Sequence, residues 1–304
     1  MLRSGNLIVA IDYEEIAKSL EGTGDYRILR RFRPRDQYTK LPKGKEHTGV
    51  IFDVETTGLN TNTDEIIEIG MIKFSYSHNG VIGEVVDTFS ALNEPNILIP
   101  AEVVEMTGIS QEDVAGQHID EEAVAAFVSD AKIIIAHNAK FDRRFCERRC
   151  EVFESGAWGC SSSQVEWRKK HGFESSRLDH LLRGVGLFHE GHRAIDDCYA
   201  VLEMLDHSVK TLNKPALALL LKEAWRTVAR VWAAGAPYSV REELKARGYK
   251  WNNGIDGRAR SWYRDVEENA SEDEIDWLKE NIFERDVDIR VQIVDPFSRF
   301  SVRD

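Results

Sequence analysis

The fold is decided by a stretch of ten residues, GVIFDVETTG, at positions 49–58. It begins with a short apolar run, which predicts a buried strand. Side chains alternate along a strand, so Asp53 and Glu55 project from one face near its carboxyl end. Two carboxylates in that place are costly unless a positive charge lies between them. The alternative interpretation is an exposed strand end whose acidic side chains are solvated.

Further strands and helices are predicted after this stretch. Residues 65–76 and 81–91 alternate in part between apolar and polar side chains, and Asn79-Gly80 between them indicates a hairpin. Residues 131–136 predict another buried strand. The predicted helices cover 121–129, 140–149, 177–183 and 194–209. Three leading antiparallel strands followed by alternating helix and strand indicate an α/β fold with a mixed sheet flanked by helices.

A second polar string, His137-Asn138-Ala139-Lys140-Phe141-Asp142, follows the predicted strand and opens a helix. Asp142 falls in the first or second turn of that helix. One interpretation is that Asn138 caps the helix and Asp142 interacts favourably with the helix dipole. The other interpretation is that Asp142 belongs to a catalytic site.

A third string, Gly191-His192-Arg193-Ala194-Ile195-Asp196-Asp197, places His192 before a helix and Asp197 inside it. Neighbouring helical residues point about 100° apart, so only one of Asp196 and Asp197 can face a given site. The alternative interpretation is a loop histidine followed by a solvated acidic first turn.

In this order the three strings resemble the motifs of the DEDDh (DnaQ-like) 3′–5′ exonucleases. That family includes the proofreading subunit of bacterial replicative DNA polymerase. The resemblance covers roughly residues 48–207 and includes two intervening strings, DEIIEIG at 64–70 and MTGI at 106–109. The four residues between His192 and Asp197 match the branch of the family that uses a histidine, which selects Asp197 as the metal ligand. The resemblance implies an RNase H-like mixed β-sheet flanked by helices.

The resemblance also implies the residues of the site. The catalytic residues would be Asp53, Glu55, Asp142, His192 and Asp197. The four carboxylates would hold two divalent metal ions, and hard oxygen ligands suit Mg²⁺ or Mn²⁺. His192 would be the general base, since an unperturbed histidine pKa of about 6.5 suits proton abstraction near neutral pH.

Contacts with the substrate terminus follow from the same resemblance. The implied substrate-binding residues are Thr56, Thr57, Gly58, Leu59, Met106, Thr107 and Asn138. The backbone at 56–58 would contact the terminal sugar, and Leu59 would lie near the last bases. For Leu59 and Met106, a place in the hydrophobic core is the alternative interpretation.

The amino-acid composition limits the functions that the chain can have. The net charge of −12 argues against a chain that simply coats DNA, but a metal-dependent nuclease needs clustered carboxylates. The early apolar stretch 7–11 is too short to span a bilayer and lacks the flanks of a signal peptide. We therefore expect a cytoplasmic protein without membrane contact. The four cysteines have no metal-ligand spacing.

Three parts of the chain are predicted. A basic N-terminal leader occupies 1–47, the exonuclease domain 48–213, and a linker helix with a small α+β accessory domain 214–304. The linker helix is expected to run from Pro215 to Ala234. Helix, strand, strand, helix and strand are expected to follow it.

The accessory domain is a candidate for binding nucleic acid or a partner protein. Basic side chains between Arg241 and Arg264 interleave with aromatic ones, a pattern that suits single-stranded nucleic acid. A module of about 70 residues also needs aromatic side chains for its own core, and we favour that place for most of them. The aromatic residues are Tyr249, Trp251, Trp262 and Tyr263.

We therefore expect a two-metal-ion 3′–5′ exonuclease that degrades single-stranded DNA or frayed 3′ ends, in repair or proofreading. A polymerase or repair protein is a further candidate partner. The motifs leave the sugar of the substrate open, so the first alternative is an exoribonuclease that trims RNA or short oligoribonucleotides. The second is a polymerase-partner or nucleic-acid-binding protein with secondary nuclease activity. The sequence does not decide the oligomeric state.

Overall fold

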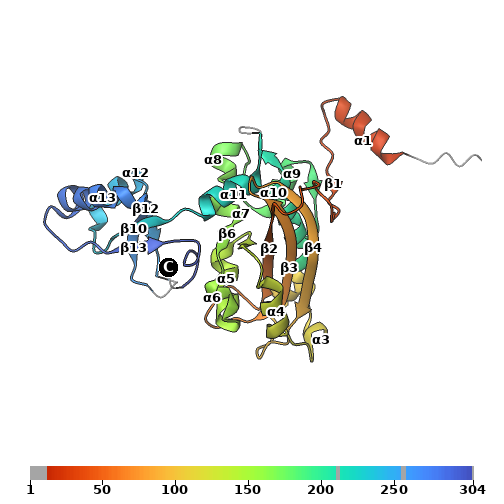
Figure 1. Ribbon diagram of the computed structural model, residues 1–304, viewed down its shortest axis with the longest axis horizontal. Helices are drawn as coiled ribbons and strands as arrows, with labels where there is room; N and C mark the ends of the chain where they lie inside the picture. Colours follow the sequence, from red (N-terminus) through yellow and green to blue (C-terminus); the bar gives the residue numbers. More distant parts are fainter. Residues whose placement is uncertain (1–11, 210–212, 255–257, 303–304) are drawn as a thin grey trace, which may run out of the picture.

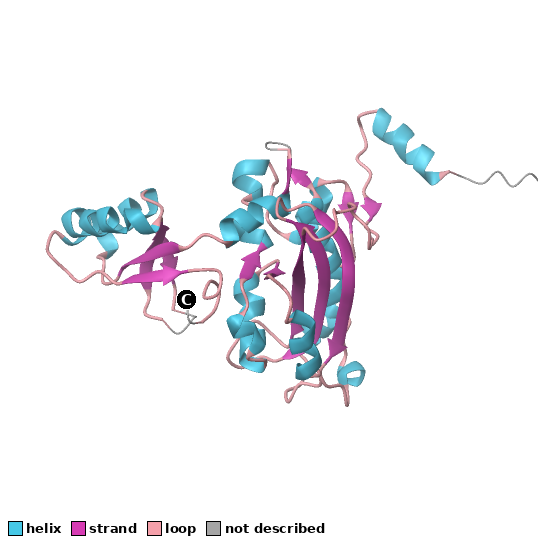
Figure 2. Ribbon diagram, in the orientation of Figure 1, coloured by secondary structure: helices cyan, strands magenta, loops and turns pink. Residues whose placement is uncertain are grey.

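The computed structural model describes residues 12–209, 213–254 and 258–302, and its largest sheet has five strands in the order β4-β3-β2-β5-β6 (Figures 1 and 2). These strands are β2 (Glu46–Thr56), β3 (Ile66–Ser77), β4 (Ile82–Leu92), β5 (Ile133–Ala136) and β6 (Trp158–Cys160). The pairs β2–β3 and β3–β4 are antiparallel, whereas β2–β5 and β5–β6 are parallel. The predicted mixed sheet is confirmed.

The hairpin between β3 and β4 turns at the predicted Asn79-Gly80. The backbone N–H of Gly80 donates to the carbonyl of Ser77 at 2.8 Å, and Ser77 N–H donates to Val81 at 2.9 Å. Gly80 has a φ of +74°, which a residue without a Cβ adopts freely. The turn type thus sets the register in which β3 and β4 pair.

Helices cover both faces of this sheet. The helices of this domain are α2 (Ala101–Thr107), α3 (Gln111–Val114), α4 (Glu121–Val128), α5 (Ala139–Arg149), α6 (Val152–Ser155), α7 (Ser161–Gln164), α8 (Trp167–His171), α9 (Leu178–Gly184), α10 (Ala194–Asp206) and α11 (Ala216–Ala224). On one face Phe52 and Met71 pack with residues of α4 and α5. On the other face Ile51 and Ile72 pack with residues of α9, α10 and α11. Because side chains alternate along β2, its two faces contribute to two separate hydrophobic cores.

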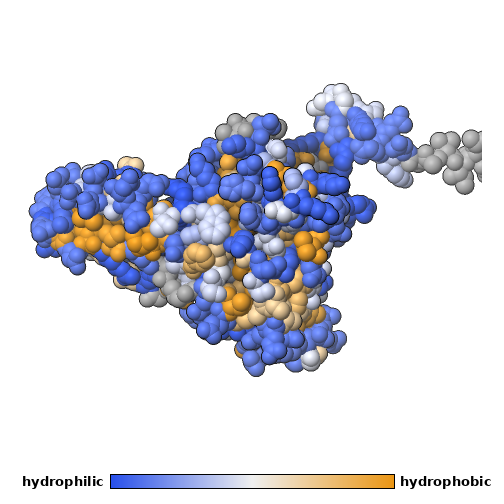
Figure 3. All heavy atoms as spheres, in the orientation of Figure 1, coloured by the Kyte–Doolittle hydropathy of each residue, from blue (hydrophilic) through white to orange (hydrophobic). Residues whose placement is uncertain are grey.

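The basic leader contains α1 (Tyr13–Gly22) and the short strand β1 (Arg30–Arg31), which pairs in parallel with β7 (Leu187–Phe188). Three of its arginines pair with acidic side chains. Arg30 contacts Glu14 and Glu21, Arg31 contacts Glu190, and Arg35 contacts Glu203 and Asp206. Figure 3 shows a hydrophilic surface on this part of the molecule. Residues 1–11 of the leader lie outside the described residues.

The predicted helix from Pro215 to Ala234 is wrong in its second half. Helix α11 ends at Ala224, and residues 228–233 form strand β10, all of which is buried. Alanine is a good helix former, but intrinsic propensity is worth less than about 1 kcal/mol per residue, and pairing with two neighbouring strands overrides it. Helix α11 itself packs into the core of the five-stranded sheet through Leu217 and Leu220.

The C-terminal module is a four-stranded antiparallel sheet in the order β11-β12-β10-β13. Its elements are β10 (Val228–Ala233), η1 (Tyr238–Val240), α12 (Arg241–Ala246), β11 (Lys250–Asn252), β12 (Ser261–Val266), η2 (Glu268–Ala270), α13 (Ser271–Leu278), η3 (Lys279–Phe283) and β13 (Val291–Val294); the pair β8 (Ser208–Val209) and β9 (Lys214–Pro215) precedes α11. The predicted order of helices and strands is confirmed. Tyr249 and Trp262 lie in its core as expected, whereas Trp251 is exposed.

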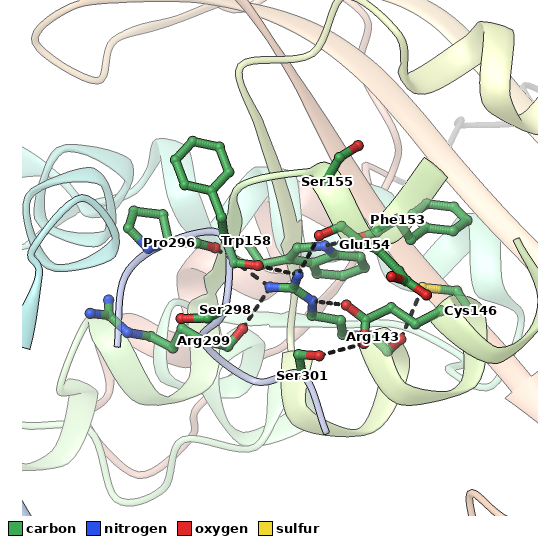
Figure 4. A network of polar contacts seen from close by, with 12 residues as sticks. Arg143, Cys146, Phe153, Glu154, Ser155, Trp158, Pro296, Ser298, Arg299 and Ser301 are labelled. Carbon is green, nitrogen blue, oxygen red and sulfur yellow. Dashed lines mark hydrogen bonds and ion pairs between the residues drawn. The ribbon is translucent and has the colours of Figure 1, made fainter. Parts of the chain in front are cut away.

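The chain after β13 returns to the nuclease domain, where a buried arginine of α5 holds it (Figure 4). Arg143 is 0% exposed. Its guanidinium donates to the carbonyl oxygens of Phe297 at 2.6 Å and Arg299 at 2.8 Å, and it pairs with Glu147 at 2.6 Å. A buried guanidinium requires such partners for its donors. These bonds fix the C-terminal tail, residues 295–301, against α5.

Within the described residues, no helix has the length and apolar character needed to cross a membrane. The four cysteines, Cys146, Cys150, Cys160 and Cys198, are buried and free.

Helix α10 approaches the sheet closely at a glycine. Gly70 of β3 pairs with Asp53 of β2. A Cβ added at Gly70 would lie 2.5 Å from the backbone carbon of Ala194 and 2.5 Å from the backbone nitrogen of Ile195. Only a residue without a side chain allows this contact, which brings the first turn of α10 against the strand that pairs with Asp53.

We expect Gly70→Ala to lower the free energy of unfolding by about 1–3 kcal/mol, because overpacking at this contact must push α10 away from the sheet. Urea unfolding measures the change. Gly22→Ala is the matched control, since a Cβ there meets nothing within 4 Å. Equal stability of the two variants would contradict the close contact.

Candidate active site

Three carboxylates from two elements meet at one end of the five-stranded sheet. Asp53 and Glu55 lie on β2, and Asp197 lies in the first turn of α10. One carboxylate oxygen from each lies within 4.8 Å of the others. Asp196 is exposed, so the structure brings Asp197 and not its neighbour into the cluster.

The fourth predicted ligand, Asp142, lies in the first turn of α5 and is 2% exposed. It is not among the three residues whose oxygens lie within 4.8 Å of one another. Its charge nevertheless raises the pKa of Asp53, so the two side chains interact. The helix that carries Asp142 begins shortly after β5, the parallel neighbour of β2.

Burial and mutual repulsion hold protons on these carboxyl groups. Burial raises the pKa of Asp53 well above its usual range, and the charges of Asp142 and Asp197 raise it further. Burial, followed by the charge of Asp197, raises the pKa of Glu55 to about 8. Burial also raises the pKa of Asp142. A bound cation would displace these protons, because a metal ligand must be deprotonated.

The donor set fits a hard divalent cation. Asp53, Glu55 and Asp197 supply only carboxylate oxygens, which Mg²⁺ and Mn²⁺ prefer. Several carboxylates buried together are costly without positive charge. The nearby guanidinium of Arg193 lowers the pKa of Glu55, but it is hydrogen-bonded to another carboxylate, that of Glu68.

Glu68 is a site residue that the sequence did not single out. It lies on β3 opposite Glu55 and is 0% exposed. Its carboxylate accepts hydrogen bonds from Arg193 at 2.7 Å and from the backbone N–H of Ala194 at 2.9 Å. It therefore satisfies the amino end of α10 and positions the helix that carries Asp197. Its place in the string DEIIEIG at 64–70 is the sequence feature that could have identified it as a site residue.

Two histidine residues hold the carboxylate of Asp197. The backbone N–H of His192 donates to Oδ2 at 2.8 Å, and Nε2 of His189 lies 2.8 Å from Oδ1. The side chain of His192 is exposed, and its φ is +73°. A non-glycine residue in this backbone region is uncommon, and such residues cluster at functional sites. Sequence reasoning gave His189 no place in the site.

The turn after β2 is fixed by its own hydrogen bonds. The hydroxyl of Thr56 donates to the carbonyl of Gly58 at 2.6 Å, and the hydroxyl of Thr57 accepts from the backbone N–H of Glu65 at 3.0 Å. Both threonine side chains are buried. They shape the turn, whereas the residue that follows it, Leu59, is 84% exposed.

The remaining predicted substrate contacts differ in exposure. Met106 is 49% exposed, so the core interpretation is wrong for both Met106 and Leu59. Thr107 is buried and donates its hydroxyl proton to the carbonyl of Val103 at 2.8 Å. Asn138 occupies the cap position of α5 but makes no side-chain capping bond, so the capping interpretation is wrong and its side chain is exposed.

A family model described as an exonuclease, RNase_T, matches residues 50–205. The chain belongs to this exonuclease family. The match includes all three residues of the carboxylate cluster, Asp53, Glu55 and Asp197. Residues 50–205 therefore form a DnaQ-like exonuclease domain, and the suspected resemblance is confirmed.

Similar proteins include DNA polymerases III of the PolC type. The DNA polymerase III PolC-type of Clostridium perfringens is 31% identical over 56% of this chain, and that of Caldanaerobacter subterraneus is 32% identical over 54%. The chain spans only 12% of the length of each of these relatives.

Among solved structures, exonuclease X bound to a 5′-overhanging duplex DNA matches 56% of this chain and 99% of its own at 25% identity and a TM-score of 0.40. A zinc-bound complex of E. coli ExoI with single-stranded DNA matches 77% of this chain and 71% of its own at 15% identity and a TM-score of 0.48.

We expect Mn²⁺ binding to strengthen as pH rises, because Glu55 with its pKa of about 8 must lose a proton to bind the ion. Affinity should rise by up to about tenfold per pH unit for each displaced proton below that pKa. Calorimetric titration of the metal-free protein at several pH values measures both affinity and proton release.

The raised pKa of Glu55 also makes the stability of the metal-free protein depend on pH. Metal affinity should rise with pH, whereas this stability should fall. The contribution of Glu55 to stability is present at low pH and is lost as pH rises toward about 8, since the unfolded chain binds fewer protons there. The control Asp196→Asn should leave both pH profiles unchanged. Metal affinity independent of pH would contradict the protonated cluster.

Proposed function

We propose that this chain is a two-metal-ion 3′–5′ exonuclease that hydrolyses single-stranded DNA, or frayed 3′ ends, to nucleoside 5′-monophosphates. The observation that carries the proposal is the meeting of Asp53, Glu55 and Asp197 within 4.8 Å. Membership of the exonuclease family supports it. Asp142 and His192 complete the catalytic set that we propose.

In this proposal the residues of the site have different chemical roles. Asp53, Glu55, Asp142 and Asp197 hold two divalent ions, Mg²⁺ or Mn²⁺, which supply positive charge for the transition state and a more acidic water. His192 accepts the proton of the attacking water at a ring nitrogen. Asp197 steadies the backbone of His192 by accepting its N–H. The 3′ oxygen of the preceding nucleotide leaves.

Recognition of a strand end fits the exposed apolar side chains of the site. Leu59 follows the fixed turn 56–58, and Met106 lies on α2; both are exposed. Exposed apolar side chains can pack against the last bases, which offer apolar faces. We propose that backbone groups of the turn contact the terminal sugar and that Thr107 and Asn138 contribute from the other elements.

DNA is the favoured substrate because the similar PolC-type relatives are DNA polymerases. An exoribonuclease is the alternative, since nothing in the carboxylate cluster distinguishes the two sugars. A polymerase or repair protein remains a candidate partner, and a nucleic-acid-binding protein with secondary nuclease activity remains the second alternative. Location in the cytoplasm stays a prediction.

We expect Asp53→Asn to lower hydrolysis by at least about 10²-fold, because a neutral amide would hold a divalent cation much more weakly than a carboxylate would. The same change should not destabilise the metal-free protein, since the amide is neutral, as is the protonated carboxyl group that burial and the neighbouring acids favour at Asp53. Asp196→Asn is the matched control and should keep full activity. An unchanged rate for Asp53→Asn with Mg²⁺ would refute the assignment of this site.

A second measurement decides the substrate. The protein is incubated with 5′-labelled single-stranded DNA, duplex DNA and RNA, each with Mg²⁺, Mn²⁺ or EDTA. We expect a descending ladder on single-stranded DNA that EDTA abolishes. A ladder on RNA alone would favour the exoribonuclease, and internal cuts without a ladder would exclude exonuclease action.

A further inference from the structure

A large cleft lies between the nuclease domain and the C-terminal module. Its volume is about 1290 Å³. One wall comes from the region of α7 and α8 in the nuclease domain, including Ser163 and Arg168, and the other comes from the module's sheet. Figure 1 shows the module placed beside the side of the nuclease domain that carries β6 and α7. The catalytic mechanism described above makes no use of this cleft.

The module turns the uncovered face of its sheet toward the cleft. In β10, Val231 and Ala233 pack under the module's helices, whereas Arg230 and Trp232 line the cleft. The same alternation holds in the neighbouring strands, where the residues on the cleft side are Tyr263, Asp265, Lys250 and Asn252. An antiparallel sheet with helices on one face leaves the other face available. Here that face carries polar and aromatic side chains.

The cleft is positively charged although the chain as a whole is negative. Nine lysine and arginine side chains line it, against four carboxylates, in a chain with a net charge of −12. Some are paired, as Lys170 is with Glu166. Arg168, Lys169 and Lys250 are exposed and have no ion pair with any described residue. They come from both walls, so an anionic ligand between the walls would meet cations on each side.

Aromatic rings accompany these cations. Phe173 on the nuclease wall and Tyr263 on the module wall are both half-buried and line the cleft. Trp232 lies 5.2 Å from the ring of Tyr263, and its buried indole N–H has no hydrogen-bond partner among the described residues. Cations that track phosphates, together with rings that stack on bases, are the chemistry of single-stranded nucleic-acid binding.

The cleft reaches the helix that carries Asp142. Asn138 lines the cleft, and the carbonyl of Asn138 accepts the backbone N–H of Asp142 at 3.4 Å. The exposed Asn138 therefore lies one helical turn before Asp142, whose charge acts on Asp53 of the cluster. The tail bonds of Arg143, the next residue on α5, hold the module in place on the same helix.

We propose that this cleft binds the single strand upstream of its 3′ end. The phosphates lie along Arg168 and Lys169 on one wall and Lys250 on the other, and bases contact Phe173 and Tyr263. The module thus lengthens the substrate-binding site of the nuclease. This inference rests on the proposed exonuclease function, because the strand is placed by its 3′ end.

The test compares two variants, Arg168→Glu/Lys169→Glu on the nuclease wall and Lys250→Glu on the module wall. The matched control is Lys43→Glu/Lys45→Glu, which makes the same change of charge at exposed leader residues away from the cleft. Binding to oligothymidylate of about 16 nucleotides, within the range of such sites, is measured in EDTA at several salt concentrations. Hydrolysis of a thymidine dinucleotide with Mg²⁺ is measured in parallel, and thermal unfolding checks the fold.

We expect each cleft variant to bind the long strand about tenfold or more weakly than the unsubstituted protein does. The slope of log affinity against log salt concentration should become shallower by about 0.7 for each phosphate that is no longer neutralised by a cation. Dinucleotide hydrolysis should stay unchanged, because a dinucleotide does not reach the cleft. The leader control should match the unsubstituted protein in every measurement.

The possible failures are distinguishable. Unchanged long-strand affinity in both cleft variants, with the dinucleotide still hydrolysed, overturns the cleft proposal alone and leaves the cleft to a different ligand, such as an acidic polypeptide. An equal loss of affinity in the leader control overturns it as well, since the effect would then be one of net charge. Absence of hydrolysis of both DNA and the dinucleotide by the unsubstituted protein overturns the exonuclease function on which it rests.

Discussion

Helix α5 carries two buried ionisable side chains in succession, and much of the molecule is arranged to satisfy them. Asp142 raises the pKa of Asp53 in the carboxylate cluster, and Arg143, about 100° further round the helix, binds the C-terminal tail. Leaving one buried charge without its partners costs about 3–5 kcal/mol. One helix therefore carries both the residue that acts on Asp53 and the residue that holds the C-terminal tail, and Figure 4 shows the tail bound to that helix.

Two residues of β3 allow α10 to reach the site. Gly70 removes the side chain that would separate the helix from β3, and Glu68 on that strand accepts the helix's first N–H. Asp197 then lies beside Asp53 and Glu55, where repulsion raises the pKa values of both partners on β2. The protein thus holds an unfavourable group of like charges that only a cation, or protons, can relieve.

The negative net charge of the chain conceals an uneven distribution. Three arginines of the leader are paired with acids, as Arg35 is with Glu203, and the interdomain cleft gathers exposed lysine and arginine side chains from two walls. A summed charge says nothing about such local surfaces. The cleft exists because the module's sheet packs its helices on one face only and the tail holds the other face toward the nuclease domain.

The sequence by itself pointed to the family, because the order and spacing of its three motifs resemble those of the DEDDh exonucleases. That resemblance implied the carboxylates and the choice of Asp197 over Asp196, whereas strand alternation placed only Asp53 and Glu55 on one face. It also predicted the β3–β4 hairpin from Asn79-Gly80. The tertiary structure alone decided the rest. Residues 228–233 became a strand because two neighbouring strands satisfied their backbone, against local helix preference. Glu68, His189 and Arg143 owe their places to partners distant in the chain, and interactions of that kind leave no periodic pattern in a sequence.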